Sequence, residues 1–265
     1  MNKKAIAKQI KVSCHHGDIN NPNQLFYVEK LIERENDFID IYEIDFVMFK
    51  NKIISSHDYD IDMIYKGSEL IKWIDLIIIK NNKILWIDIK ENLSIFCNSY
   101  NQFNIYLFFK QLEIIRKKII NDINLDIINF IWISCQETNL YDKIIEINNK
   151  KQRPNSVTQE IRENKWIIVY DIPSIDSYIY QIILGTIGLN CIINDSVYNK
   201  YIQLDLTQYK YISIDQSFFY DIHDLLEFIN RLILSKNTNI VLYNFKLNIP
   251  PITIPDYNII MQYDF

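Results

Sequence analysis

The sequence predicts an α/β fold, and the arrangement that fits it best is a (β/α)8 TIM-type barrel in one domain spanning residues 1–265. Short strand-like runs alternate with longer helical runs, which is the pattern of βα units and a parallel sheet. About eight such units fit into 265 residues, at roughly 33 residues a unit, as in a barrel of typical length. An open doubly wound sheet is the alternative, and after about residue 190 the pattern is irregular.

The predicted strands are short runs rich in β-branched and aromatic residues, each bounded by polar or turn-forming residues. In chain order they are Ile10–Cys14, Ile39–Val47, Lys52–Ser55, Lys83–Ile89, Ile127–Ser134, Trp166–Tyr170, Tyr201–Leu206, Tyr211–Ile214 and Asn239–Tyr243. The predicted helices are mostly longer runs between these strands. They are Asn23–Glu35, Gly67–Ile79, Tyr100–Ile120, Tyr141–Ile147, Ser174–Gly185 and Ser217–Leu234, with a polar loop at Asn148–Glu163.

Composition and charge exclude several classes of protein. The net charge is −5, and the 28 basic and 33 acidic residues are spread along the chain, whereas binding to a nucleic-acid backbone requires a basic surface. No apolar run approaches the ~18–20 residues of a membrane span, and the N-terminal segment is too short in its apolar part for a secretory signal. The four cysteines are scattered, which is typical of reduced thiols. We therefore expect a cytoplasmic protein that does not bind nucleic acid, with its oligomeric state open.

Histidines gather where predicted strands end. His15 and His16 follow the first strand and precede Gly17, one of only four glycines, and His57 follows the third strand. In parallel α/β folds the carboxyl ends of the strands form the active face. The fourth histidine, His223, lies in a helical stretch and is expected to be a surface or helix-packing residue.

Acidic side chains lie on the strands near these histidines. Glu43 and Asp45 are two residues apart on one predicted strand and so point to the same face, as do Asp88 and Lys90 at the end of another. If the three carboxylates come within ~5 Å of one another, each pair repels by about 3 kcal/mol at an effective dielectric near 20. Proton uptake would relieve this repulsion, and so would an oxygen-liganded cation such as Mg²⁺ or Ca²⁺. The pattern therefore indicates a site for one divalent cation with imidazoles around it.

Four short motifs in this region resemble the active-site signatures of glycerophosphodiester phosphodiesterases. More broadly, they resemble those of the phospholipase-C-like phosphodiesterase superfamily. The motifs are HHG at 15–17, EID at 43–45, HD at 57–58 and DIK at 88–90. The resemblance covers about residues 10–92 and implies a TIM-type barrel, in agreement with the alternation of strands and helices.

The resemblance also implies a role for each residue. Glu43, Asp45 and Asp88 would hold one divalent cation, Mg²⁺ or Ca²⁺. His15 and His57 would be the general acid and base, each contributing ~10²–10⁴-fold to the rate. The implied substrate is a small-molecule or lipid-derived phosphodiester, attacked by water or by one of its own hydroxyls, and the latter route gives a cyclic phosphate first.

The resemblance further implies that two residues contact the substrate phosphate, Lys90 and His16. His16 stands where the family has an arginine, and a neutral imidazole cannot supply the bidentate fork of a guanidinium group. Gly17 favours His15 as the catalytic imidazole, and His16 remains the alternative. The family's motif on the last strand is missing, since VLYN stands at 241–244, and residues 57–88 leave no room for a substrate-capping insertion. Two alternatives therefore stay open: a non-catalytic relative that binds a phosphorylated ligand or partner, and a lyase whose end product is a cyclic phosphate.

Overall fold

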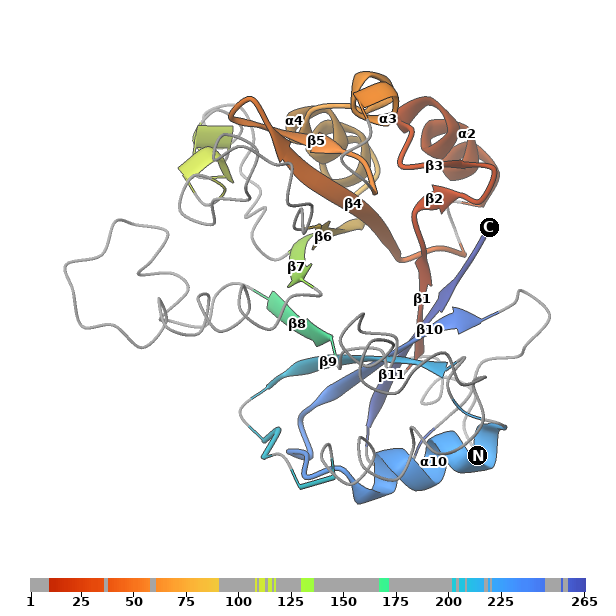
Figure 1. Ribbon diagram of the computed structural model, residues 1–265. Helices are drawn as coiled ribbons and strands as arrows, with labels where there is room; N and C mark the ends of the chain where they lie inside the picture. Colours follow the sequence, from red (N-terminus) through yellow and green to blue (C-terminus); the bar gives the residue numbers. More distant parts are fainter. Residues whose placement is uncertain are drawn as a thin grey trace, which may run out of the picture. The chain divides into compact units, whose positions relative to one another are not determined.

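The computed structural model describes most of the first 90 residues and several later segments (Figure 1). The described ranges are 10–35, 38–57, 61–90, parts of 108–117, 130–135, 167–171, parts of 202–219, 221–245, 254 and 257–265. The chain divides into two compact units. The larger unit comprises Val12–Ile168 and Asp264–Phe265, and the smaller unit comprises Met1–Lys11 and Val169–Tyr263.

The larger unit is built on parallel strands in the order β1 (Ile10–Cys14), β4 (Ile41–Phe49), β6 (Ile84–Ile89) and β7 (Ile131–Cys135). One further strand, β5 (Lys52–Ser55), pairs antiparallel with the second half of β4. A two-residue pair of strands, β2 (Gly17–Asp18) and β3 (Asn21–Pro22), follows β1. The register sets Asp45 opposite Asp88, so acidic residues of two strands become neighbours.

Helices cover one side of β4 and β5 (Figure 1). They are α2 (Leu25–Glu35), α3 (Ile61–Lys66) and α4 (Leu70–Trp73), which continues as the π-helix η1 (Ile74–Lys80). In α2 the buried residues Val28, Leu31 and Ile32 follow helical spacing and form its inner face. Trp73 packs edge-on against Phe46 of β4, with ring centroids 6.3 Å apart.

The β4 strand is buried on both of its faces, as parallel strands between two layers are. Side chains along β4 alternate between the face covered by helices and the opposite face. Phe46 faces the helix side, where it contacts Trp73. Because successive side chains point to opposite faces, Glu43 and Asp45 project together to the other side.

The smaller unit contains parallel strands in the order β8 (Ile167–Asp171), β9 (Tyr211–Asp215), β10 (Asn239–Phe245) and β11 (Asn258–Tyr263). Its described helix is α10 (Ile222–Arg231), which buries Leu225, Phe228 and Ile229. The Asp221 side chain caps this helix by accepting hydrogen bonds from the backbone N–H groups of His223 and Asp224. No helix in the described ranges has both the length and the hydrophobicity needed to cross a membrane.

Most predicted elements in the described ranges are confirmed, and β1 and β5 have the predicted bounds. The predicted strand Tyr201–Leu206 is wrong at the described positions, which form a turn and one isolated bridge from Asp205. There the Asp205 carboxylate accepts hydrogen bonds from the backbone N–H and the hydroxyl of Thr207, a local pattern that competes with strand pairing. The strand β11 and the helix α3 were not predicted. Because β11 follows β10, the VLYN residues at 241–244 lie on the penultimate described strand and not on the last one, where they were expected.

Three predicted elements lie outside the described residues, namely Tyr141–Ile147, Ser174–Gly185 and the loop Asn148–Glu163. Within the predicted helix Tyr100–Ile120, the described positions between 108 and 117 are helical.

Candidate active site

Three buried carboxylates converge in the larger unit. Glu43 is 2% exposed, Asp45 is 0% exposed and Asp88 is 5% exposed. One oxygen from each lies within 4.8 Å of the others. The strands explain this arrangement, because Asp45 and Asp88 are register partners on neighbouring parallel strands and Glu43 shares the face of Asp45. We call these three residues the carboxylate cluster.

Lys90 brings one positive charge into the carboxylate cluster. Its Nζ lies 3.0 Å from Asp45 Oδ1 and 2.5 Å from Asp88 Oδ2. Burial works to lower the pKa of Lys90, but Asp45 and Asp88 outweigh that effect and hold the pKa well above its ordinary value. Lys90 therefore carries its proton at neutral pH.

Two polar residues outside the predicted set position the carboxylates. Asn23 donates from Nδ2 to Asp45 Oδ2 at 2.8 Å and accepts the Asp45 backbone N–H at 2.9 Å. The Ser134 hydroxyl donates to Asp88 Oδ1 at 2.8 Å, and these two residues are register partners on β6 and β7. The alternation of the predicted strand ending at Ser134 offers a signal for this residue, whereas Asn23 stands in a turn without a distinguishing pattern.

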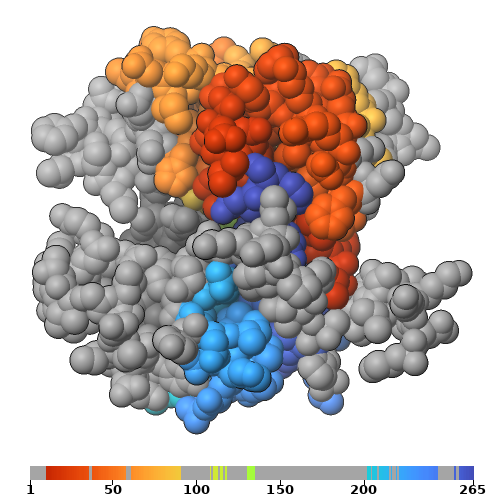
Figure 2. All heavy atoms as spheres, turned by 90° about the vertical axis from the view of Figure 1, so that its right-hand side faces the viewer, coloured from red at the N-terminus to blue at the C-terminus, as the bar shows by residue number. Residues whose placement is uncertain are grey.

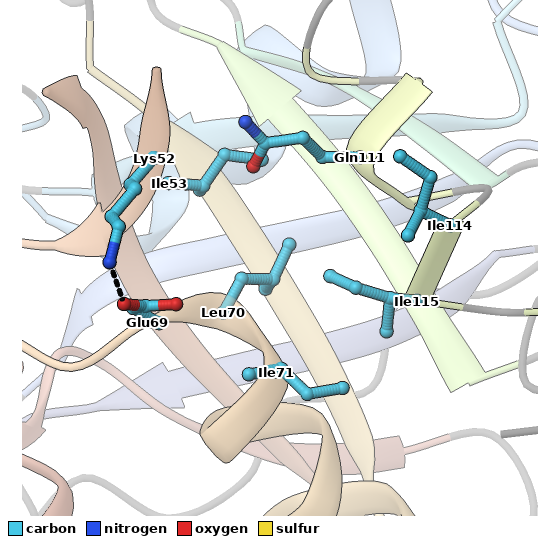
Figure 3. Close-up of a pocket in the computed structure, with 8 residues that line it drawn as sticks. All are labelled: Lys52, Ile53, Glu69, Leu70, Ile71, Gln111, Ile114 and Ile115. Atoms are coloured by element: carbon cyan, nitrogen blue, oxygen red, sulfur yellow. Dashed lines mark hydrogen bonds and ion pairs between the residues drawn. The ribbon is translucent and has the colours of Figure 1, made fainter. Parts of the chain in front are cut away.

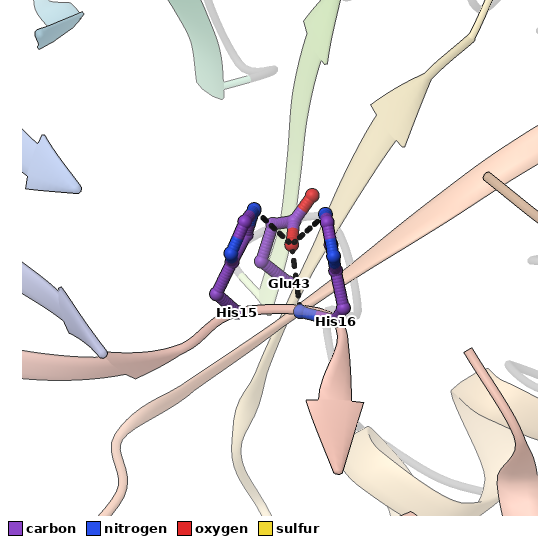
Figure 4. A group of neighbouring side chains, drawn as sticks. All are labelled: His15, His16 and Glu43. Carbon is purple, nitrogen blue, oxygen red and sulfur yellow. Dashed lines mark hydrogen bonds and ion pairs between the residues drawn. The ribbon is translucent and has the colours of Figure 1, made fainter. Parts of the chain in front are cut away.

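His15 and His16 stand on either side of the Glu43 carboxylate (Figure 4). Their Nε2 atoms lie 3.9 Å and 3.8 Å from Glu43 Oε2. Glu43 Oε2 also accepts the backbone N–H of His16 at 3.0 Å, and His16 Nε2 lies 3.1 Å from Asp45 Oδ2 without the alignment of a hydrogen bond. His16 has φ of 54°, a left-handed conformation that is uncommon outside glycine and is often found at functional sites.

Gly17 makes this turn possible. It has φ of +80°, and a Cβ at this position would lie 2.3 Å from Cγ2 of Val28 on α2. Both observations exclude a larger residue without local rearrangement. Gly17 thus lets the chain turn sharply after β1, with His15 and His16 held beside the carboxylate cluster.

The position of His57 after a predicted strand suggests that it lies at the carboxyl end of a parallel strand. In the structure His57 instead reaches the site through the β4–β5 hairpin, whose strands are antiparallel. Because β5 runs antiparallel to β4, it returns the chain to the level of Asp45, where the Ser56 backbone N–H donates to the Asp45 carbonyl at 3.0 Å. The His57 ring meets His16 edge-on, with centroids 5.5 Å apart. One nitrogen of His57 lies within 4.8 Å of ligand atoms of His16 and Asp45. His57 is exposed, so it can also face a substrate.

Burial and charge set the protonation states in the site. Burial, with Asp45 and Asp88 nearby, raises the pKa of Glu43 well above its ordinary value. For Asp45, burial acts in the same direction, but Lys90 and His16 outweigh it and lower its pKa. Burial lowers the pKa of His16 to about 3 despite the nearby Asp45. His16 is therefore neutral at physiological pH, and Glu43 holds a proton more readily than Asp45.

The donor set fits a hard divalent cation. The carboxylate cluster brings three acidic groups together, while Lys90 contributes a single positive charge. Asp45 Oδ1 accepts no hydrogen bond although it is buried; its close neighbour is the Lys90 ammonium group. Oxygen donors gathered in this way are what Mg²⁺ and Ca²⁺ prefer. A second group of possible ligands, His16, Asp45 and His57, adjoins the cluster.

The surroundings of Cys14 make its thiol a poor nucleophile, although this residue directly precedes His15. The Cys14 thiol is buried, donates to the Gly17 carbonyl at 3.1 Å, and has a pKa raised by burial and by Glu43. It therefore stays protonated and lacks the thiolate character of a nucleophile.

A separate pocket of about 180 Å³ lies at the turn end of the β4–β5 hairpin (Figure 3). Apolar side chains dominate its lining, and Lys52 and Glu69 form an exposed ion pair there. None of the candidate site residues lines this pocket. Its lining residues are Lys52, Ile53, Glu69, Leu70, Ile71, Gln111, Ile114 and Ile115.

No protein-family model matches the sequence, and no curated protein matches it. Solved structures do match its fold. A protein from Silicibacter pomeroyi DSS-3 that is designated a glycerophosphoryl diester phosphodiesterase shares 8% identity with a TM-score of 0.51. The match covers 96% of this chain and 89% of that one. A protein of the same designation from Agrobacterium tumefaciens strain C58 shares 9% identity with a TM-score of 0.55, over 96% of this chain and 93% of that one.

These comparisons confirm the predicted α/β fold of the (β/α)8 barrel class and the resemblance to glycerophosphodiester phosphodiesterases at the level of the fold. The structure brings all the predicted site residues together. They are His15, His16, Glu43, Asp45, His57, Asp88 and Lys90. Their chemical roles stay predictions.

Proposed function

We propose that this chain is a metal-dependent phosphodiesterase that hydrolyses a glycerophosphodiester or another phosphodiester of the lipid-headgroup type. The observation that carries the proposal is the convergence of three buried carboxylates with three imidazoles around them. The similarity of the fold to that of the two designated phosphodiesterases supports it.

Glu43, Asp45 and Asp88 would hold the cation, either Mg²⁺ or Ca²⁺. When bound, the cation supplies positive charge that polarises the phosphodiester, a contribution of several kcal/mol in such sites. Asn23 and Ser134 keep Asp45 and Asp88 in place through the hydrogen bonds described above.

The imidazoles of His15 and His57 would transfer the protons. One accepts the proton of the attacking hydroxyl as its oxygen forms a bond to phosphorus. The other donates a proton to the alkoxide as the bond between phosphorus and the leaving oxygen breaks. If the attacking hydroxyl belongs to water, the products are a phosphomonoester and an alcohol.

Lys90 and His16 would face the negative charge of the phosphate. Lys90 keeps its charge, because Asp45 and Asp88 raise its pKa. His16 is neutral, since burial lowers its pKa to about 3, so it can contribute a hydrogen bond but not a positive charge. We therefore expect weaker phosphate affinity than an arginine at this position would give.

The neutral state of His16 and the ion pairs of Lys90 favour one competing function. Turnover needs positive charge beyond what binding needs, because charge develops in the transition state. With His16 neutral and the only described buried cation paired with Asp45 and Asp88, the alternative is a relative that binds a phosphorylated ligand weakly and without turnover. Hydrolysis assays separate this function from catalysis.

The test is hydrolysis of bis(p-nitrophenyl) phosphate and of glycerophosphocholine by protein freed of metal with EDTA and then supplied with Mg²⁺ or Ca²⁺. We expect activity only with metal, and a loss of ~10²–10⁴-fold in the variant His57→Ala. The matched control is His223→Ala, which removes the exposed histidine of α10 and should leave the rate unchanged. Activity that needs no metal and persists in the double variant His57→Ala, Asp88→Ala would contradict the proposal. Phosphorus NMR of the product distinguishes hydrolysis from release of a cyclic phosphate.

A further inference from the structure

A carboxylate far along the chain meets His15. Oδ1 of Asp264, the residue after β11, lies 2.8 Å from His15 Nδ1. Neighbouring contacts hold this segment, because the Ile19 backbone N–H donates to the Phe265 carbonyl at 2.7 Å. The rings of Phe38 and Phe265 meet edge-on with centroids 6.1 Å apart. Figure 2 draws the atoms as spheres, with the first part of the chain in red and the last residues in dark blue.

This hydrogen bond decides which ring nitrogen of His15 carries a proton. The bond from His15 lowers the pKa of Asp264, so this carboxylate is ionised at neutral pH and can only accept. His15 Nδ1 must therefore be the donor. In the neutral ring the nitrogen without a proton is then Nε2, which lies 3.9 Å from Glu43 Oε2.

We propose that Asp264 is a positioning residue that fixes the orientation and the tautomer of His15, so that its Nε2 accepts the proton of the attacking hydroxyl. This inference rests on the proposed phosphodiesterase function and assigns the proton acceptor within it. His57 is then the proton donor to the leaving group. His16 is not equivalent, because its Nε2 lies 3.1 Å from Asp45 Oδ2 within the carboxylate cluster, whereas His15 has the carboxylate partner Asp264 outside the cluster. A carboxylate that orients an imidazole in this way is a recurring device in catalytic and metal sites.

The direct test is nitrogen-15 NMR of the histidine side chains in the full chain. Only four histidines need assignment, and His15→Gln identifies the signals of His15. In the wild-type protein we expect a protonated Nδ1 and an unprotonated Nε2. In Asp264→Asn, whose amide can also donate, we expect a shift of His15 toward the tautomer with a protonated Nε2, whereas Asp264→Glu should keep the wild-type tautomer. A wild-type His15 with its proton on Nε2, or no tautomer change in Asp264→Asn, would overturn the proposal.

Kinetics provide the second measurement, with bis(p-nitrophenyl) phosphate and Mg²⁺. Asp264→Asn should lower kcat by at least tenfold and leave KM and the Mg²⁺ affinity, measured by titration calorimetry, within about twofold. Asp75→Asn, the same change at a half-exposed residue of η1, should leave every value unchanged. A kcat unaltered in Asp264→Asn would also overturn the proposal. If the wild-type protein turns over no substrate, the proposed function fails, and the NMR signals still decide whether Asp264 sets the tautomer of His15.

Discussion

At the scale of the single residue, Glu43 is the carboxyl whose pKa responds to the excess of negative charge in the site. It is buried beside two other carboxylates, and it accepts the backbone N–H of the strained His16. Its pKa is raised by burial and by Asp45 and Asp88. Protonation of Glu43 is thus one way to reduce the repulsion in the carboxylate cluster, and a bound cation is the other, because metal ligands must lose their protons.

This arrangement predicts how stability depends on pH in the metal-free protein. Folded Glu43 holds its proton at pH values where an unfolded glutamate, with a pKa of about 4.3, has released it. Unfolding therefore releases a proton, and the free energy of unfolding falls as pH rises above about 4.3, by at most about 1.4 kcal/mol per pH unit. The measurement is urea denaturation in EDTA from pH 5 to pH 8.

Glu43→Gln should flatten this dependence, while Glu227→Gln, the same change on exposed α10, should preserve it. Added Mg²⁺ should stabilise the wild-type protein more at pH 8 than at pH 6. Identical slopes for the wild-type protein and Glu43→Gln would show that another group dominates the pH dependence.

At the scale of the element, the β4–β5 hairpin delivers the second proposed catalytic imidazole. Its turn residues, Lys50 and Asn51, have φ of 48° and 61°. Two consecutive left-handed residues form the tight hairpin turn whose twist matches that of the strands, for which Asn-Gly is the preferred sequence. The β5 strand then brings His57 back beside Asp45.

The turn predicts a stabilising substitution. Lysine in the left-handed region costs about 1 kcal/mol, and asparagine tolerates that region better. Lys50→Asn should therefore raise the free energy of unfolding by up to ~1 kcal/mol, while Lys50→Ala, which loses the charge without gaining this tolerance, should not. Urea denaturation measures both, and equal effects of the two variants would assign the change to the lost charge rather than to the backbone.

The first 90 residues were the most predictable part of the site. Alternation within strands places Glu43 with Asp45 and Asp88 with Lys90, and histidine and glycine are rare enough here for HHG to stand out. These patterns are local, so they can be recognised in the sequence without knowledge of the tertiary structure. Alternation alone does not give the direction in which a strand pairs, so the antiparallel path to His57 was implied only by the family resemblance of residues 42–60, which includes a hairpin-like turn.

The positioning residues could not be predicted in the same way. Ser134 meets Asp88 through the register of β6 and β7, and Asp264 meets His15 across 249 residues of chain. Such contacts depend on how distant segments pack. Alternation places Ser134 on one face of its strand, but it does not give the partner of Ser134, and no local pattern marks Asp264. Asn23 was missed because the sequence pattern places it at the start of a predicted helix, where an asparagine is common. Its role appears only when Asp45 lies beside it.

At the scale of the whole molecule, the chain passes between its two compact units within β1, within β8 and again after β11. The prediction of one domain over residues 1–265 stays a prediction, and cooperativity tests it. Strands that contribute residues to both units would transmit the loss of structure from one unit to the other, so we expect a single unfolding transition.

The test uses Asp221→Ala, which removes the cap of α10 in the smaller unit and should cost about 1 kcal/mol. Hydrogen exchange of backbone amides in urea should show an equal loss of protection in α10 and in β4 and β6 of the larger unit. Loss confined to the smaller unit would instead indicate two domains that unfold independently.

The hydrogen bond between His15 and Asp264 has a consequence for synthesis on the ribosome. Translation produces His15 early, together with the carboxylate cluster and His57, whereas Asp264 is added 249 residues after its partner. A nascent chain can therefore gather the carboxylate cluster before the imidazole is oriented. If His15 transfers protons as proposed, this transfer would begin only when Asp264, the residue after β11, has been made and has reached its place beside His15.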